Sequence, residues 1–125
     1  MNSNKFLGVR HNGQLPDPAA VVVPSDIGDF LEDYIESTES QLDELEQAIL
    51  RYEAGQTPDQ DAAEIRRILH KIKGESGIVG LDEVADFVHE VENAFEELSE
   101  DQRPDMLFRF KDWTTTAIDS MCAEN

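Results

Sequence analysis

The sequence predicts an all-α protein, an antiparallel up-and-down four-helix bundle with a flexible N-terminal arm. Glycine and proline are scarce, with 7 and 5 residues in 125, and strong helix formers with few β-branched clusters fill residues 27–55 and 59–98. Apolar residues recur at three- and four-residue spacing in four separate stretches. Four such helices with short connections bury their apolar stripes most simply as one antiparallel bundle.

The N-terminal segment, residues 1–24, shows no helical period. Its breakers are Gly8, Gly13, Pro16, Pro18 and Pro24. We therefore expect a flexible arm at 1–24 followed by the bundle at 25–125, with the three valines at 21–23 as the part of the arm that could pack on it. His11 has no partner at ligand spacing and is expected to be solvated.

The first helix is long and amphipathic. Ser25 or Asp26 can cap it, and it should end near Gly55. Its apolar positions are Ile27, Phe30, Leu31, Tyr34, Ile35, Leu42, Leu45, Ile49 and Tyr52. The opposite face is rich in carboxylates, which a solvated surface explains better than a metal site.

The second helix is predicted to start at a capping box, Thr57-Pro58-Asp59-Gln60, and to break near Gly80. The third helix follows at once, with inward positions Leu81, Val84, Val88, Val91, Phe95 and Leu98. The turn at 103–105 precedes a fourth helix, whose apolar positions are Met106, Leu107, Phe110, Trp113, Ala117, Ile118 and Met121.

One face of the second helix is continuously apolar or small. Its members Ile68, Leu69, Ile72, Ser76 and Val79 fall within about 60° of Ile65 on a helical projection. His70 lies near 140°, outside this stripe, so the imidazole is predicted to point outward.

Small and basic residues surround His70 on that outward side. Lys73 falls near 80°, Gly77 near 120° and Gly74 near 180°. A glycine inside a helix costs about 1 kcal/mol relative to alanine, so two of them on an exposed face need a reason beyond folding. They leave a bare patch around one nucleophilic nitrogen, onto which another protein could place its active site. The alternatives are that the glycines mark a helix end and that the histidine is merely solvated.

Glu92 on the third helix lies near 40° from Val88, at the edge of the buried face, while His89 lies near 100°. A carboxylate there is costly unless it is hydrogen-bonded. Antiparallel packing could bring Glu92 to His70, where it would accept a proton from one ring nitrogen and leave the other free to attack. A local pair between His89 and Glu92, or simple exposure, is the alternative.

The charge distribution narrows the choice of partners. A formal net charge of −18 argues against binding to nucleic acid or to an anionic membrane surface. Four of the ten basic residues nevertheless fall within eight positions around His70, namely Arg66, Arg67, Lys71 and Lys73. This positive island suits a transient phosphate, although the same residues could pair with carboxylates on neighbouring helices.

The remaining composition bounds the setting. A single cysteine, Cys122, excludes an internal disulfide and fits a reducing compartment. No apolar run approaches the roughly 18 residues of a membrane span, and the N-terminus has no signal-like apolar region. We expect a soluble, cytoplasmic monomer.

Two motifs carry a resemblance to a known family. Residues 70–80, H-K-I-K-G-E-S-G-I-V-G, resemble the H-x-L-K-G-x-[SA]-x-x-x-G motif of histidine-containing phosphotransfer (HPt) domains, including the domain that opens chemotaxis-type histidine kinases. Residues 89–92, H-E-V-E, are similar to the H-x-x-E of the chemotaxis-type branch. The resemblance spans roughly residues 27–121 and implies His70 as phosphoacceptor. It further implies charge support by Lys73, imidazole orientation by Glu92 and His89, and partner docking over Gly74, Gly77, Arg66, Arg67 and Lys71.

The implied function is phosphoryl carriage between a histidine kinase or hybrid kinase and the receiver-domain aspartate of a response regulator. No phosphate-binding loop of the G-x-x-x-x-G-K-[ST] or G-x-G-x-x-G type occurs, so we expect no ATP site and no kinase activity in this chain, which could be a module of a larger histidine kinase. No bound cofactor is expected, and the resemblance implies Mg²⁺ on the receiver.

Two other functions remain open. One is a structural adaptor that has lost phosphotransfer. The other is a carboxylate–histidine metal bundle, which is disfavoured because the chain has one His-x-x-Glu, the reverse of the Glu-x-x-His order that such bundles use twice. We therefore predict no metal site.

Overall fold

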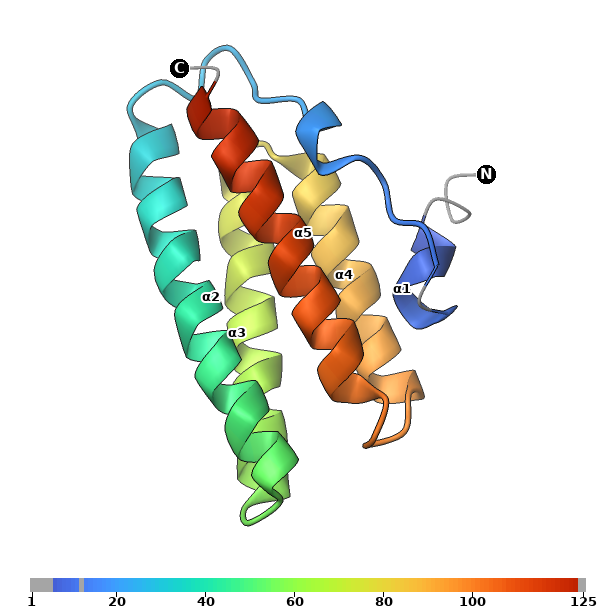
Figure 1. Ribbon diagram of the computed structural model, residues 1–125. Coiled ribbons are helices and arrows are strands. Elements are labelled where there is room, and N and C mark those ends of the chain that lie inside the picture. Colours follow the sequence, from blue (N-terminus) through green and yellow to red (C-terminus); the bar gives the residue numbers. More distant parts are fainter. Residues whose placement is uncertain (1–5, 12, 124–125) are drawn as a thin grey trace.

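The computed structural model describes residues 6–11 and 13–123, and all regular structure in that part is helical. The bundle consists of α2 (Phe30–Ala54), α3 (Pro58–Ile78), α4 (Asp82–Glu97) and α5 (Arg103–Ala123). Successive helices run in opposite directions and are joined by short turns (Figure 1). The predicted all-α four-helix bundle is therefore confirmed.

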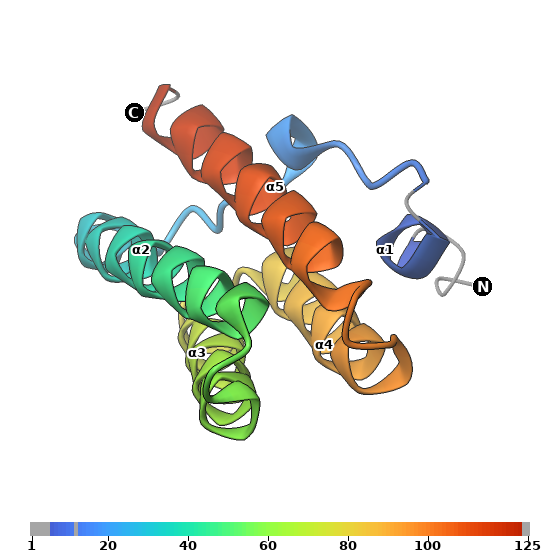
Figure 2. The ribbon, with the colours of Figure 1, turned by 60° about the horizontal axis from the view of Figure 1, so that its bottom comes forward.

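The core is built from the stripes that the sequence predicted, except that Phe30 at the start of α2 is exposed. On α3, Ile65, Ile68, Leu69 and Ile72 are fully buried, and Figure 2 shows how the four helices surround this interior. Val79 was placed in the same stripe but is only half-buried, because α3 ends one residue before it.

Backbone geometry sets the helix ends. Gly55 (φ 77°) and Gly80 (φ 84°) adopt the left-handed conformation that suits glycine and terminates helices, at the predicted places. Gly28 (φ 49°) also adopts the left-handed conformation, just before α2. The helix therefore begins at Phe30 and not after Ser25 or Asp26. The predicted cap at these two residues is therefore wrong.

The predicted capping box at the start of α3 is also not formed. Thr57 is the N-cap residue and Pro58 occupies the first turn, but the threonine side chain makes no bond to the helix backbone. Its hydroxyl donates instead to a carboxylate oxygen of Asp61 (3.0 Å). The threonine side chain is thus turned toward the buried carboxylate, and its oxygen accepts no bond from the backbone N–H groups of the first turn.

The segment predicted to be a flexible arm is packed against the bundle. It contains α1 (Leu7–His11) and the short 3₁₀ helix η2 (Pro18–Ala20), and its path lies along α4 and α5 (Figures 1 and 2). Phe6, Val9 and Val21 are buried, and Phe6 stacks on Phe87 of α4 with 6.0 Å between ring centroids. The packing of Val21 agrees with the expectation that the valines at 21–23 could contact the bundle, whereas Phe6 and Val9 follow no helical period and were not predicted. The side chain of His11 lies outside the described residues.

Polar contacts fix the same segment. The Arg109 guanidinium donates to the carbonyl oxygens of Gly8 (2.7 Å) and Gly13, and Trp113 Nε1 donates to the carbonyl of Pro16 (2.7 Å). Arg10 pairs with two carboxylates of α4, Glu90 at 3.0 Å and Glu97 at 2.8 Å. The described residues of this segment, 6–11 and 13–24, therefore form part of the fold.

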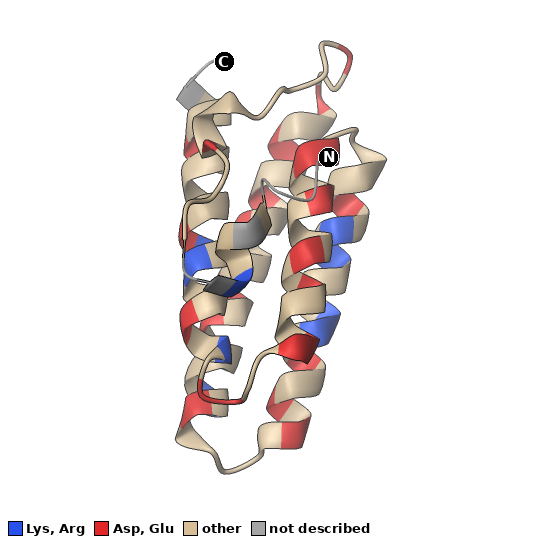
Figure 3. Cartoon of the chain, turned by 90° about the vertical axis from the view of Figure 1, so that its right-hand side faces the viewer, with Lys and Arg blue, Asp and Glu red and all other residues tan. Residues whose placement is uncertain are grey.

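The surface is predominantly acidic. Figure 3 shows acidic positions spread over the helices with few basic positions among them, in keeping with the net charge of −18. No helix in the described part of the chain is both long and apolar enough to cross a membrane.

Candidate functional site

His70 projects from the exposed side of α3, and 76% of its side chain is accessible. The apolar stripe on the other side of the helix holds α3 in the core, so the outward position of His70 follows from the sequence. Gly74 and Gly77 are exposed, and a Cβ atom added to either would meet no atom within 4 Å. The helix surface beyond His70 is therefore bare, as predicted.

Glu92 lies between three cationic or titratable groups. Its Oε2 is 3.7 Å from His70 Nδ1, and its Oε1 is 2.7 Å from Lys73 Nζ and 3.9 Å from His89 Nδ1. From the sequence, either His70 or His89 could be the partner of Glu92, and the structure places Glu92 near both. Its tightest contact is with Lys73, which the sequence analysis did not predict.

These distances define what each contact is. The Lys73–Glu92 distance is that of a charge-assisted hydrogen bond, whereas the His70–Glu92 distance exceeds hydrogen-bonding range. Because Nδ1 is the ring nitrogen that faces Glu92, Nε2 is the nitrogen left for a reactant.

Most of the predicted basic island is paired with carboxylates. Arg66 holds Glu96 at 2.6 Å and lies over the Phe95 ring, 5.2 Å from its centroid. This hydrogen bond lowers the pKa of the Glu96 carboxyl below its ordinary value of 4.5. Lys71 is exposed and makes no ion pair with any described residue. Arg66 is therefore paired with a carboxylate on a neighbouring helix, as the alternative interpretation of the basic island proposed. Lys71 remains available to a partner.

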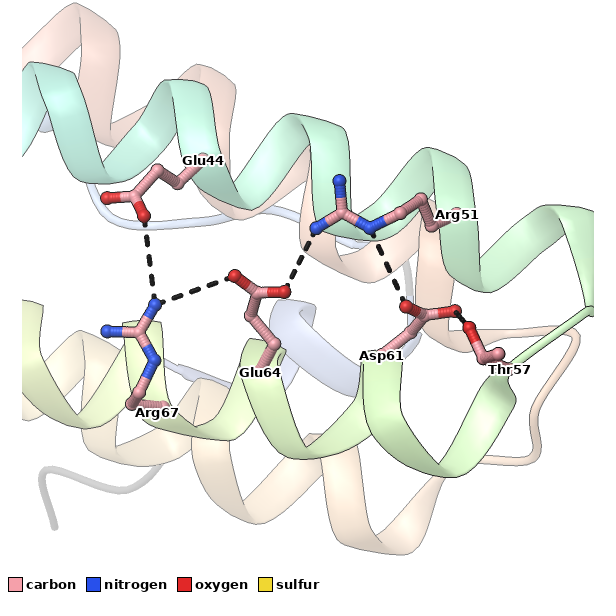
Figure 4. A network of polar contacts seen from close by, with 6 residues as sticks. All are labelled: Glu44, Arg51, Thr57, Asp61, Glu64 and Arg67. Carbon is pink, nitrogen blue, oxygen red and sulfur yellow. Dashed lines mark hydrogen bonds and ion pairs between the residues drawn. The ribbon is translucent and has the colours of Figure 1, made fainter.

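Arg67 belongs to a polar network that joins α2 to the first half of α3 (Figure 4). Its Nη2 is 3.7 Å from Glu44 and 3.6 Å from Glu64, and Arg51 donates to Glu64 (3.0 Å) and lies 3.6 Å from the buried Asp61. The network connects α2 with the helix that carries His70, and Arg67 takes part in it through long, half-exposed ion pairs.

A buried polar contact fixes the second half of α3 against α2. The hydroxyls of Tyr34 and Ser76 are 2.7 Å apart, and burial raises the pKa of Tyr34. Beside this contact, Ser37 donates to Glu75 (2.8 Å). Sequence analysis assigned Ser76 only to the small stripe. The signal that could have paired it with Tyr34 is a tyrosine on the buried face of the preceding helix.

No group of three or more histidine, cysteine, aspartate and glutamate side chains within residues 6–11 and 13–123 is arranged to hold a metal ion. Cys122 is an exposed free thiol.

The sequence model of the Hpt domain family matches residues 29–123, so the chain belongs to the Hpt domain family. This class places the chain in two-component phosphorelay signalling, in agreement with the motif around His70.

Two similar proteins are chemotaxis proteins CheA. The one from Halobacterium salinarum is 27% identical over 101 residues, which cover 76% of this chain and 15% of the relative. The one from Rhizobium meliloti is 31% identical over 71 residues, which cover 57% of this chain and 9% of the relative. The chain thus spans only a small part of each. No solved structure gives a significant match.

Proposed function

We propose that His70 is the phosphoacceptor of this domain and that the chain carries a phosphoryl group between a histidine kinase and the receiver aspartate of a response regulator. The observation that supports this most directly is an exposed imidazole on a bare helical surface, with Nδ1 facing a carboxylate. Family membership supports the same chemistry.

In the proposed reaction, Glu92 accepts a hydrogen bond from Nδ1–H of neutral His70, and the lone pair of Nε2 attacks the phosphorus atom. The bond from phosphorus to the donor oxygen breaks, an N–P bond forms, and the donor leaves as ADP or as the receiver carboxylate. In the onward step, the receiver carboxylate attacks phosphorus and the N–P bond breaks. Positioning and charge neutralisation supply most of the catalysis in such transfers.

The neighbouring residues have distinct proposed roles. Lys73, one turn from His70, would leave its contact with Glu92, bind a phosphoryl oxygen and neutralise the charge of the phosphoryl group. His89 would help to hold Glu92. Gly74 and Gly77 would admit the partner. Lys71 would contribute an attractive charge to docking.

Arg66 and Arg67 would take part in docking less directly than Lys71. Arg66 and Arg67 could contact a partner only by exchanging their present ion pairs. We further propose that the chain acts as a cytoplasmic monomer, and that the receiver contributes the Mg²⁺ ion and the acceptor aspartate.

The test uses receiver domains cloned from the genome that encodes this chain, phosphorylated beforehand with acetyl phosphate and supplied with Mg²⁺. Wild type and His89→Gln should acquire acid-labile phosphate, and His70→Gln should acquire none. Substantial label on His70→Gln would refute the assignment of the phosphoacceptor. A wild type that takes no label from any receiver would favour the structural adaptor.

A further inference from the structure

Helix α4 carries Glu92 and is held from two sides. Figures 1 and 2 show α4 between α3 and α1 of the N-terminal segment. On the side of α3, Glu92 contacts Lys73 at 2.7 Å. On the side of the segment, Arg10 contacts Glu90 at 3.0 Å and Glu97 at 2.8 Å. The position of α4 therefore depends on the N-terminal segment as well as on α3.

A helical projection shows how these contacts are related. At about 100° per residue, Glu97 lies about 140° and Glu90 about 160° around α4 from Glu92. The two carboxylates that bind Arg10 thus project from nearly the opposite side of the helix to the carboxylate that faces the imidazole. Loss of the contacts with Arg10 removes a restraint on rotation and sideways shift of α4, and either movement displaces Glu92.

The contact of Arg10 with α4 is directional. All three guanidinium nitrogens donate, Nε and Nη2 to the two carboxylate oxygens of Glu97 (3.0 and 2.8 Å) and Nη1 to Glu90 (3.0 Å). A bidentate pair of this kind fixes orientation as well as distance. Phe6 stacks on Phe87 near the start of the same surface. The segment therefore holds α4 over ten residues, or about 15 Å of its axis.

The segment is itself anchored on a different helix. From α5, the Arg109 guanidinium donates to the carbonyl oxygen of Gly8 and Trp113 Nε1 donates to that of Pro16, both at 2.7 Å. The backbone is also packed closely, because a Cβ atom added to Gly8 would collide with the carbonyl oxygen of Gln14. The N-terminal segment thus connects α5 to the outer side of α4 through a fixed backbone.

We propose that the N-terminal segment is a positioning element of the phosphotransfer site, which supports α4 against α3 and thereby keeps Glu92 beside the ring of His70. This inference rests on the proposed function and deepens it, because it makes Arg10 a positioning residue for an imidazole on another helix. Phosphoryl transfer depends chiefly on positioning and charge, and a misplacement of about 1 Å can cost on the order of 100-fold in rate.

The experiment uses two variants of the segment and one matched control. Arg10→Met removes the contacts with α4, and Gly8→Ala displaces the segment without changing any charge. The control, Lys111→Met, removes a cation that is 21% exposed, as Arg10 is, from its ion pair with Glu46 (3.1 Å) between α5 and α2. Melting curves establish that every variant is folded at the assay temperature.

The probe is potassium phosphoramidate, which labels His70 without any partner. Nε2 attacks phosphorus, the P–N bond of the reagent breaks, and ammonia leaves and takes up the proton that the ring gives up. The ¹⁵N signals of the His70 ring, measured without the reagent, report which ring nitrogen carries the proton. Each variant is also combined with Glu92→Gln, because such a cycle shows whether two changes act through the same contact.

Arg10→Met and Gly8→Ala should lower the rate of labelling by about 3- to 10-fold, which is less than the fall caused by Glu92→Gln. Their ring signals should move in the same direction as those of Glu92→Gln. In the Glu92→Gln background, neither change should lower the rate further, because the carboxylate that the segment positions is gone. Lys111→Met should match the wild type in rate and in ring signals.

Three outcomes would overturn the inference. The first is a wild-type rate with unchanged ring signals in Arg10→Met and Gly8→Ala. The second is an equal fall in the Glu92→Gln background, which would show that the segment acts by another route. The third is a similar fall in Lys111→Met, which would assign the effect to stability alone. Label on His70→Gln equal to that of the wild type would instead refute the proposed function, while the ring signals would still report on the segment.

Discussion

Gly77→Gln tests whether the bare surface beside His70 serves partner access. The substitution is sterically free within the domain, because a Cβ at Gly77 meets nothing within 4 Å and the position is exposed on α3. Gly77 lies in the last turn of α3, so replacing it should stabilise the fold by less than the roughly 1 kcal/mol expected in a helix interior, and the rise in melting temperature should stay below about 4 °C.

Transfer should respond in the opposite direction. The new side chain stands about two turns beyond His70 on the same side of α3 and would hold a docked receiver away. A misplacement of about 1 Å can cost on the order of 100-fold in rate, so we expect transfer to fall by that order. Thermal melts, calorimetry with the receiver and labelled-phosphate transfer measure the three effects.

Gly77→Ala provides the matched control, because it gives the same gain in helix propensity with one methyl group in place of a long side chain. It should be as stable as Gly77→Gln and should transfer far better. A Gly77→Gln protein that transfers at the wild-type rate would show that the glycine does not serve partner access.

Three further perturbations give distinct outcomes. Glu92→Gln should slow transfer by about 10- to 100-fold with the fold intact, because an amide oxygen can accept a hydrogen bond from His70 but carries no negative charge to stabilise the imidazole as it becomes cationic. Wild-type kinetics together with unchanged imidazole NMR signals would contradict this. Phe6→Ala should lower the free energy of unfolding by about 3 kcal/mol in urea melts, whereas a free arm would give no change. For Glu96→Gln, the lowered pKa of Glu96 means that its bond to Arg66 stabilises the fold above pH 4.5 and is lost as the pH falls through that lowered pKa. The difference in stability between wild type and this variant should therefore be largest near neutral pH and vanish in acid, and a difference independent of pH would refute the linkage.

The sequence was sufficient to predict the orientation of α3. The stripe from Ile65 to Ser76 has a strict helical period, and burial of that stripe leaves His70 and the two glycines facing outward. The position of Glu92 was predicted less fully, because the edge of a buried face requires a partner for a carboxylate but does not choose between His70 and His89, and the structure places Glu92 near both.

Contacts between long side chains were less predictable. Lys73 could have remained in solvent, yet its four-carbon chain reaches Glu92 at 2.7 Å. Arg66 likewise has a choice of acidic neighbours, and only the packing of α3 on α4 selects Glu96. Periodicity gives the face of a helix that a residue occupies, but the choice among several carboxylates depends on distances between helices.

The N-terminal segment escaped prediction for a different reason. Val9 belongs to a helix of five residues, too short to show a period, and Phe6 lies just before that helix. The contacts that fix the segment come from Arg109 and Trp113, about 100 residues later in the sequence. Nothing local indicates such a pairing.

The docked segment has a consequence for how the domain is isolated. A fragment cut at the family boundaries, residues 29–123, would omit Phe6 and the carbonyl groups that accept from Arg109 and Trp113. Phe87, now 1% exposed, would lose the cover of Phe6 on one side and keep its contacts with Phe110 and Trp113 of α5. Such a fragment would expose aromatic surface that is covered in the longer chain. Partners captured with it would include proteins that recognise the cut and not the domain.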